Sequence, residues 1–223
     1  MKRPRETHES SYMKHDVLIA DDHAIIRDGL RKILADTDDL VVQGEAANGN
    51  ALLEQVRARD WSLLVLDISM PGRNGLELVK MVKNLRPKLP ILIFSMHPEE
   101  QYAVRAIRAG ASGYLSKEGD SELLLPAMRR VVAGGMFISP NVAELLASDI
   151  APQSQSLPHT QLTDREFDVF SRIVRGMGLT AIAAELSLSV KTVSTHKTHI
   201  LAKMNLSTQI DLVRYAIDHH LVD

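Results

Sequence analysis

Short apolar runs alternate with longer segments of helical spacing along the first part of the chain. The runs are rich in Val, Ile and Leu and occupy residues 17–20, 41–45, 63–67, 91–95 and 113–115. The first, third and fourth runs are almost continuously apolar, which is typical of strands buried on both faces of a parallel sheet. This alternation predicts a doubly wound α/β domain with five parallel strands and helices on both faces of the sheet.

The segments between the runs indicate where helices end and which faces they bury. Gly110 follows a helical segment and is expected to end it in the left-handed conformation. Ser121 is expected to cap the next helix, which has Glu122 in its first turn and ends near residues 134–135. The helix after the first run is expected to bury the apolar residues that recur there at helical spacing, which are Ile25, Ile26, Leu30, Ile33 and Leu34.

A different pattern begins near residue 148. Residues 148–161 contain prolines, serines and glutamines without periodicity and predict a linker. Residues 162–221 hold four helical segments and no strand-like run, with a capping-box pattern at Thr163 and Glu166. The second and third segments meet at residues 187–189, which is a helix-turn-helix spacing. We therefore expect a tail at 1–14, an α/β domain at 15–134, a connecting helix and linker at 135–160, and an all-α four-helix domain at 161–223.

Composition narrows the class of protein. The 223 residues are 45% hydrophobic and 24% charged, with a net charge of -2, which is ordinary for a globular protein. The chain has no apolar run long enough for a membrane span, no secretory signal in its first residues and no cysteine for disulfides. We therefore expect a cytoplasmic protein without a membrane partner, in which any affinity for nucleic acid comes from a local cluster of positive charge.

Chemically active groups stand at the ends of four of the predicted strands. Asp21 and Asp22 follow the first, Asp67 ends the third, Ser95 ends the fourth, and Lys117 comes just after the fifth. The carboxyl ends of parallel strands share one edge of the sheet, where open α/β folds place their functional groups. Three carboxylates there repel one another unless a cation neutralises them, and Mg²⁺ is the hard, oxygen-preferring ion expected for that task.

Each of these residues also has a purely structural interpretation. Asp21 and Asp22 could cap a helix, and Asp67 could open a turn. Ser95 and Lys117 could be solvated groups in loops. The functional interpretation is favoured because all of them fall on one edge of one sheet and their chemistry is complementary.

The third helical segment of the all-α domain, residues 190–204, is basic. It carries Lys191, Lys197 and Lys203, two histidines and no acidic residue. Its apolar positions can pack inward while hydroxyl and lysine side chains face outward, as in a helix that enters the major groove of DNA. The alternatives are a solvated basic helix and, for His196, a histidine satisfied within the core.

Four motifs within residues 16–134 resemble those of the receiver domain of two-component response regulators, which has a flavodoxin-like fold. They are LIADDH at 18–23, LDISMPGRNG at 66–75, FSMH at 94–97 and AGASGYLSK at 109–117. The resemblance implies that Asp67 accepts a phosphoryl group from a sensor histidine kinase. It implies a Mg²⁺ site formed by Asp21, Asp22, Asp67 and the backbone carbonyl of Ser69.

The same resemblance assigns roles to the remaining polar residues of this edge. Lys117 would pair with the phosphoryl oxygens, and Ser95 would hydrogen-bond to them. Tyr114 would be the aromatic residue that turns inward when Ser95 moves. These roles agree with the chemistry of phosphoryl transfer, which needs in-line positioning and cations on the equatorial oxygens.

The all-α domain resembles the DNA-binding domain of NarL/FixJ (LuxR-type) regulators. The matching motifs are LTDRE at 162–166, GLTAIAAELSLSVKTVSTH at 178–196 and KM at 203–204. The resemblance implies that the last helix, 208–219, supports dimerisation on DNA. It places the DNA contacts on phosphate-binding lysines and base-facing hydroxyl residues, which are Lys191, Thr192, Ser194, Thr195, Lys197 and Thr198. Some regulators of this family have Arg or Lys at the base-facing positions. This chain has hydroxyl residues there, so we expect recognition of DNA shape to contribute more than direct recognition of guanine.

Together the two resemblances imply a transcription factor and not an enzyme. Phosphorylation would control homodimerisation and binding to double-stranded DNA, with RNA polymerase as a further candidate partner. One alternative is a Mg²⁺-dependent phosphatase of haloacid-dehalogenase type, but that class needs an acid two residues after the nucleophile, where this chain has Ser69. The other alternative is a receiver that acts without phosphorylation, which loss of Asp67 would leave unaffected.

Overall fold

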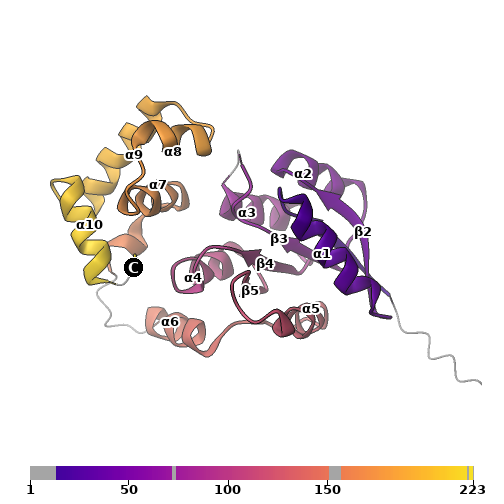
Figure 1. Ribbon diagram of the computed structural model, residues 1–223. Coiled ribbons are helices and arrows are strands. Elements are labelled where there is room, and N and C mark those ends of the chain that lie inside the picture. The colour runs from indigo at the N-terminus through magenta and orange to yellow at the C-terminus, as the bar shows by residue number, and fades with distance from the viewer. Residues whose placement is uncertain (1–13, 72–73, 151–156, 220, 223) are drawn as a thin grey trace, which may run out of the picture.

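The computed structural model describes residues 14–71, 74–150, 157–219 and 221–222, so residues 1–13 of the expected tail lie outside the described part. Figure 1 shows two bodies, an α/β domain followed by a helical domain. The elements of the first are β1 (His15–Ala20), α1 (Ala24–Ala35), β2 (Leu40–Ala46), α2 (Gly49–Ala58), β3 (Leu63–Leu66), α3 (Gly75–Leu85), β4 (Ile91–Ser95), α4 (Glu99–Ala109), β5 (Gly113–Ser116), η1 (Ser121–Leu123) and α5 (Leu124–Val132). They are followed by α6 (Pro140–Ile150), η2 (Pro158–Gln161), α7 (Asp164–Val174), α8 (Leu179–Glu185), α9 (Val190–Lys203) and α10 (Gln209–Asp218).

The five strands form one parallel sheet in the order β2-β1-β3-β4-β5, which confirms the predicted fold class. Buried residues of α1 and α5 pack on one face of this sheet, and those of α2, α3 and α4 pack on the other. The strand order reverses at β1, so the loops after β1 and β3 meet at the switch point of the sheet. The fold therefore brings the ends of these strands to one place.

Two predictions about helix faces and caps were wrong. In α1, Leu30 and Leu34 are buried, but Ile25 is 80% exposed and Ile33 is 39% exposed. Adjacent helical residues are separated by about 100°, so a helix that presents Leu30 and Leu34 to the sheet turns Ile33 toward solvent. The cap of the helix after β5 is Asp120 rather than Ser121, because the Asp120 carboxylate accepts from the Glu122 amide at 2.8 Å. Gly110 ends α4 with a φ of 110°, as predicted.

The connection between the domains is more ordered than the sequence suggested. Helix α6 continues to Ile150, inside the segment expected to be linker, and η2 covers residues 158–161. Pro158 is compatible with η2 because the first position of a helix needs no amide donor. Residues 151–156 of the expected linker lie outside the described residues.

The helical domain is a helix-turn-helix, as predicted. Thr163 and Glu166 form the expected capping box at α7, whose apolar face is buried. The turn between α8 and α9 places Ser187 at a φ of 53°, and Ser189 then caps α9 through the Thr192 amide at 3.0 Å. None of the helices in the described part of the chain is long and apolar enough to cross a membrane.

The two domains share one hydrophobic cluster. The ring of Tyr102 in α4 meets the ring of Phe167 in α7 edge-on, with centroids 5.2 Å apart. The Arg105 guanidinium lies 4.1 Å from the centre of the Phe167 ring and donates to the backbone carbonyls of His159 at 2.7 Å and Leu162 at 2.8 Å. Helix α7 is thereby docked on the side of the parallel sheet that α3 and α4 cover (Figure 1).

Candidate functional site

The charged residues predicted at the sheet edge lie together. Asp21 and Asp67 are buried at the ends of β1 and β3. The Lys117 ammonium reaches across from β5 to within 2.5 Å of one carboxylate oxygen of Asp21 and 2.5 Å of one carboxylate oxygen of Asp67. All three side chains are almost fully excluded from solvent, so their mutual attraction is weakly screened. The result is a buried site in which one cation pairs with two acids and leaves a net charge of one carboxylate uncompensated.

A third carboxylate, that of Asp22, provides a further oxygen ligand for a metal ion at this site. Asp21, Asp22, His23 and Asp67 each offer a ligand atom, and these atoms lie within 4.8 Å of one another. Asp22 Oδ1 is buried without a hydrogen bond to any described residue. A hard divalent cation fits this donor set, because carboxylate oxygens predominate in it. Asp22 Oδ1 itself lies 3.2 Å from His23 Nδ1. His23, which the sequence reasoning did not select, lies beside the acids with Nδ1 3.3 Å from Asp21 Oδ1.

The predicted switch residues adjoin the acids. The Ser69 amide donates to Asp67 Oδ1 at 2.8 Å, and the Ser69 hydroxyl lies 3.1 Å from the buried Ser95 hydroxyl. Tyr114 is buried, and its hydroxyl donates to the His97 carbonyl at 2.8 Å. Burial raises the pKa of Tyr114 well above its ordinary value, so the phenol stays protonated and keeps this hydrogen bond.

Helix α9 presents most of the predicted DNA-binding residues to solvent. Lys191, Ser194, Thr195 and Thr198 are exposed, whereas Thr192 and Lys197 are half-buried. Lys203 points back into its own domain and donates to Glu166 at 2.6 Å. The predicted DNA-binding face therefore has one exposed lysine, one half-buried lysine and a row of hydroxyl groups.

His196 of α9 adds less positive charge than the sequence suggested. His196 is half-buried, and its Nδ1 is buried without a hydrogen bond to any described residue. Burial lowers the pKa of His196 below its ordinary value, and Arg165 lowers it further. The expectation of a satisfied core histidine is thus half right, because the ring is partly in the core but Nδ1 has no such bond.

Comparison with known proteins identifies both domains. Residues 17–129 match the response regulator receiver domain, and residues 160–216 match the luxR family of bacterial regulatory proteins. The chain is 36% identical over 214 residues to the oxygen regulatory protein NreC of Staphylococcus carnosus, covering 93% of this chain and 99% of that protein. This chain is a response regulator of the NarL/FixJ family.

Further relatives agree with this assignment. The response regulator UvrY of Escherichia coli is 32% identical to this regulator over 207 residues, covering 92% of this chain and 95% of that protein. A solved structure of RcsB from Salmonella enterica serovar Typhimurium, bound to promoter rprA in the presence of the phosphomimetic BeF3⁻, has a TM-score of 0.65 and 27% identity. The alignment covers 91% of this chain and 98% of that one. The regulator therefore combines a receiver domain with a LuxR-type DNA-binding domain, which is consistent with phosphorylation-controlled regulation of transcription.

Several polar residues of the regulator's domain interface escaped the sequence reasoning. The Asn74 side-chain amide donates to buried Asp168 at 2.5 Å, and Lys80 donates to Asp164 at 2.6 Å. Burial raises the pKa of Asp168 to about 6. No local pattern indicates these pairs, because Asn74 and Asp168 are 94 residues apart.

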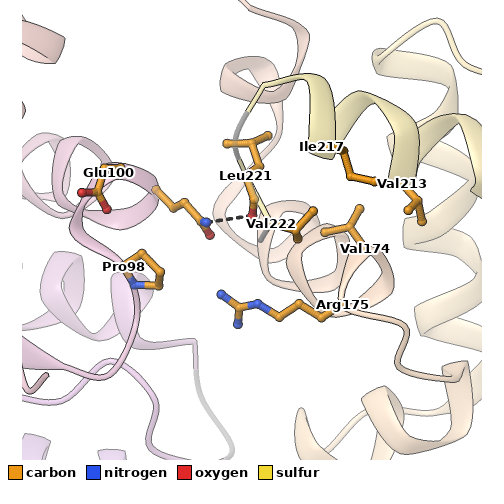
Figure 2. A pocket seen from close by; sticks show the side chains of 9 residues that line it. Pro98, Glu100, Val174, Arg175, Val213, Ile217, Leu221 and Val222 are labelled. Carbon is orange, nitrogen blue, oxygen red and sulfur yellow. Dashed lines mark hydrogen bonds between the residues drawn. The ribbon is translucent and has the colours of Figure 1, made fainter.

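A cavity of about 720 Å³ lies between the two domains of the regulator. One wall is the start of α4 with Pro98 and Glu100, and the opposite wall is formed by the end of α7 and by α10 with Val213 and Ile217 (Figure 2). The Gln101 side chain bridges it by donating to the Leu221 carbonyl at 2.7 Å. The domains thus touch through separate contacts with cavities between them.

We expect the loop that follows Asp67 to require glycine at position 75, which is the first residue of α3. A Cβ atom there would lie 2.4 Å from the Cα, Cβ and carbonyl oxygen of Ile68, so Gly75→Ala must displace the backbone that directly follows Asp67. We expect this change to lower the free energy of unfolding by about 1 to 3 kcal/mol, measured by urea denaturation. Gly29→Ala is the matched control, because nothing lies within 4 Å of its added Cβ. A neutral Gly75→Ala would contradict the packing described here.

Proposed function

We propose that Asp67 is the residue that accepts the phosphoryl group and that the Asp21–Lys117–Asp67 cluster controls this reaction. The observation that carries the proposal is the Lys117 ammonium at 2.5 Å from both carboxylates, at the edge of the sheet where the strand ends meet. The ammonium lies close enough to Asp67 to pair first with its carboxylate and then with the phosphoryl group that the carboxylate receives. Residue positions of this kind stabilise phosphoryl transfer by electrostatics rather than by covalent chemistry.

The transfer itself needs only a correctly placed carboxylate. A carboxylate oxygen of Asp67 forms the new bond to phosphorus, the bond from phosphorus to the donor's leaving atom breaks, and that atom keeps the electron pair. The Ser69 amide holds the other oxygen of Asp67 at 2.8 Å and so fixes the orientation of the nucleophile. Lys117 then pairs with a phosphoryl oxygen, and the Ser95 hydroxyl donates to another.

Mg²⁺ is the cofactor that fits this site. Asp21, Asp22, Asp67 and the carbonyl of Ser69 would hold it, and it would neutralise the acids and polarise the phosphoryl oxygens. The buried Asp22 Oδ1 supports this choice, because it accepts no hydrogen bond from a described residue and its contact with His23 Nδ1 at 3.2 Å is an ion pair only when that ring is protonated.

The hydroxyl groups of α9 are suited to accept hydrogen bonds from DNA. Thr195 donates to the Lys191 carbonyl at 3.0 Å, and Thr198 donates to the Ser194 carbonyl at 3.1 Å. Their protons are used within the helix, so the lone pairs that remain can accept from the amino groups of adenine or cytosine but cannot donate to guanine. This supports a limited direct readout, with DNA shape supplying further specificity.

The partners follow from these two sites. The protein acts in the cytoplasm, where a sensor histidine kinase supplies the phosphoryl group and a homodimer binds double-stranded DNA through two copies of α9. RNA polymerase is a further candidate partner. We do not class the protein as an enzyme, because its proposed role is to bind DNA under the control of phosphorylation.

Genome-wide footprinting tests the proposal. Occupied sites are mapped with the purified protein and Mg²⁺, with and without a small acyl phosphate as donor. We expect a set of sites whose protection increases with the donor. Equal occupancy in both conditions would refute control by phosphorylation.

Lys191 and Lys197 are expected to bind DNA phosphates. Lys191→Ala and Lys197→Ala should each weaken binding across all sequences and reduce the slope of log affinity against log salt concentration by about 0.9. Fluorescence anisotropy with a target duplex at several salt concentrations measures this slope. Lys203→Ala is the control, because Lys203 pairs with Glu166 and should leave the slope unchanged. An unchanged slope in the Lys191 and Lys197 variants would exclude them as phosphate contacts.

A further inference from the structure

A small cavity of about 160 Å³ lies between the phosphoacceptor edge of the receiver and helix α7 of the DNA-binding domain. It is large enough for about five water molecules or for one hydrated phosphate-sized anion. The residues that line it come from both domains and include Asp22, Ser69, His97, Arg165, Asp168 and Arg172. The DNA-binding domain therefore covers the rim of the site where Asp67 lies.

Arg165 has unused hydrogen-bonding capacity at this cavity. Its Nη2 donates to the Leu186 carbonyl at 3.0 Å, which fixes the guanidinium. Its Nη1 is buried and makes no hydrogen bond to any described residue, and the Oδ2 of Asp168 is 4.0 Å away. A buried cationic donor without an acceptor is unfavourable, so an acceptor that enters the cavity would be stabilised.

The other basic groups of the cavity are already satisfied or neutral. Arg172 donates to Glu185 at 3.0 and 2.8 Å and to the Asp168 carbonyl at 3.1 Å. Burial lowers the pKa of His97 to about 4, so its ring is neutral at neutral pH. Among the described residues that line the cavity, Arg165 is therefore the cation with a free donor.

We propose that this cavity binds a phosphate-class oxyanion through Arg165, so that the DNA-binding domain contributes a cationic ligand to the receiver's site. The inference rests on the proposed role of Asp67. The oxyanion is either the phosphoryl group on Asp67 or the phosphate end of a small acyl phosphate donor, which share tetrahedral geometry and charge. Each phosphoryl oxygen has more than one lone pair, so contacts from Lys117 and Ser95 leave acceptors for a guanidinium.

The test uses the full-length chain with Mg²⁺ and a radiolabelled acyl phosphate. Two quantities are measured for the wild type, Arg165→Gln, Arg165→Lys and Arg175→Gln. They are the donor concentration that gives half the maximal rate of labelling and the half-life of the label after the donor is removed. Arg175 is the matched control, because it is an exposed arginine that lines the larger interdomain cavity instead.

Each source of the oxyanion predicts a different result. If the donor binds at Arg165, Arg165→Gln raises the half-saturating donor concentration by about tenfold, the loss expected for a charge-assisted hydrogen bond. If the phosphoryl group on Asp67 binds there, the same variant shortens the half-life of the label severalfold. In both cases Arg165→Lys recovers part of the effect, which separates loss of charge from misfolding, and Arg175→Gln matches the wild type.

Other results would contradict the inference or the proposed function on which it rests. If the wild type is labelled and Arg165→Gln has the same half-saturation and half-life, the cavity holds only water and the inference is wrong. If Arg165→Lys behaves like Arg165→Gln, or if Arg175→Gln shows the same defect, the effect is not a contact of Arg165 with the oxyanion and the inference is also wrong. If the wild type itself takes up no label, the proposed function fails first.

Discussion

Asp67→Asn should take up no label from an acyl phosphate or from a phosphorylated kinase. Asparagine has nearly the same shape as aspartate but lacks the carboxylate that forms the bond to phosphorus. We therefore expect labelling to fall to background, and we expect the donor to cause no increase in DNA affinity. Gel autoradiography measures the first, and anisotropy with a target duplex measures the second.

The control for this experiment is Asp38→Asn, since Asp38 is exposed and outside the acidic cluster. It should be labelled like the wild type. Label retained by Asp67→Asn would show that another residue accepts the phosphoryl group. DNA binding that responds to the donor equally in both variants would favour the alternative of a receiver that works without phosphorylation.

Lys117→Met should destabilise the protein strongly when Mg²⁺ is absent. The change removes the ammonium from between Asp21 and Asp67, whose side chains are only 3% and 1% exposed. Breaking a buried ion pair from one side typically lowers the free energy of unfolding by about 3 to 5 kcal/mol, because the remaining charges lose their compensation. Urea denaturation in the presence of a chelator measures this loss.

Two comparisons sharpen this prediction. Asp67→Asn in the Lys117→Met background should recover part of the loss, because it removes one of the uncompensated charges. Added Mg²⁺ should do the same in the single variant. Lys88→Met, at an exposed position, should have little effect. A loss below about 1 kcal/mol for Lys117→Met would place the interaction in the range of a surface ion pair and contradict the buried geometry.

The sheet edge could be predicted from sequence because its information is local. A parallel strand places its last residue at a fixed edge, so Asp21, Asp67 and Lys117 could be brought together on paper once the strands were located. Ser121 was mistaken for the helix cap because Asp120, one residue earlier, has an equally suitable side chain, and the competition is decided by backbone geometry. The exposure of Ile25 was missed because hydrophobicity does not state which of two adjacent apolar residues faces the sheet.

The domain interface could not be predicted in this way. Arg165 and Arg172 are charged residues on a surface helix, and their sequence pattern is the same whether that surface faces water or another domain. Arg172 is buried and Arg165 is half-buried where α7 docks against the receiver, and this docking depends on contacts such as that between Tyr102 and Phe167. The resemblance to a known family names the two domains but does not specify how they contact each other.

Arg105 holds the DNA-binding domain through main-chain oxygens, those of His159 and Leu162. Every amino acid carries a carbonyl oxygen, so mutations in η2 can accumulate without removing the groups that Arg105 recognises, provided that the short helix keeps its course. A mutation of Arg105 itself has no such tolerance. The contact between the two domains can therefore persist through evolution as long as Arg105 is kept, even when the sequence of the segment that it binds changes.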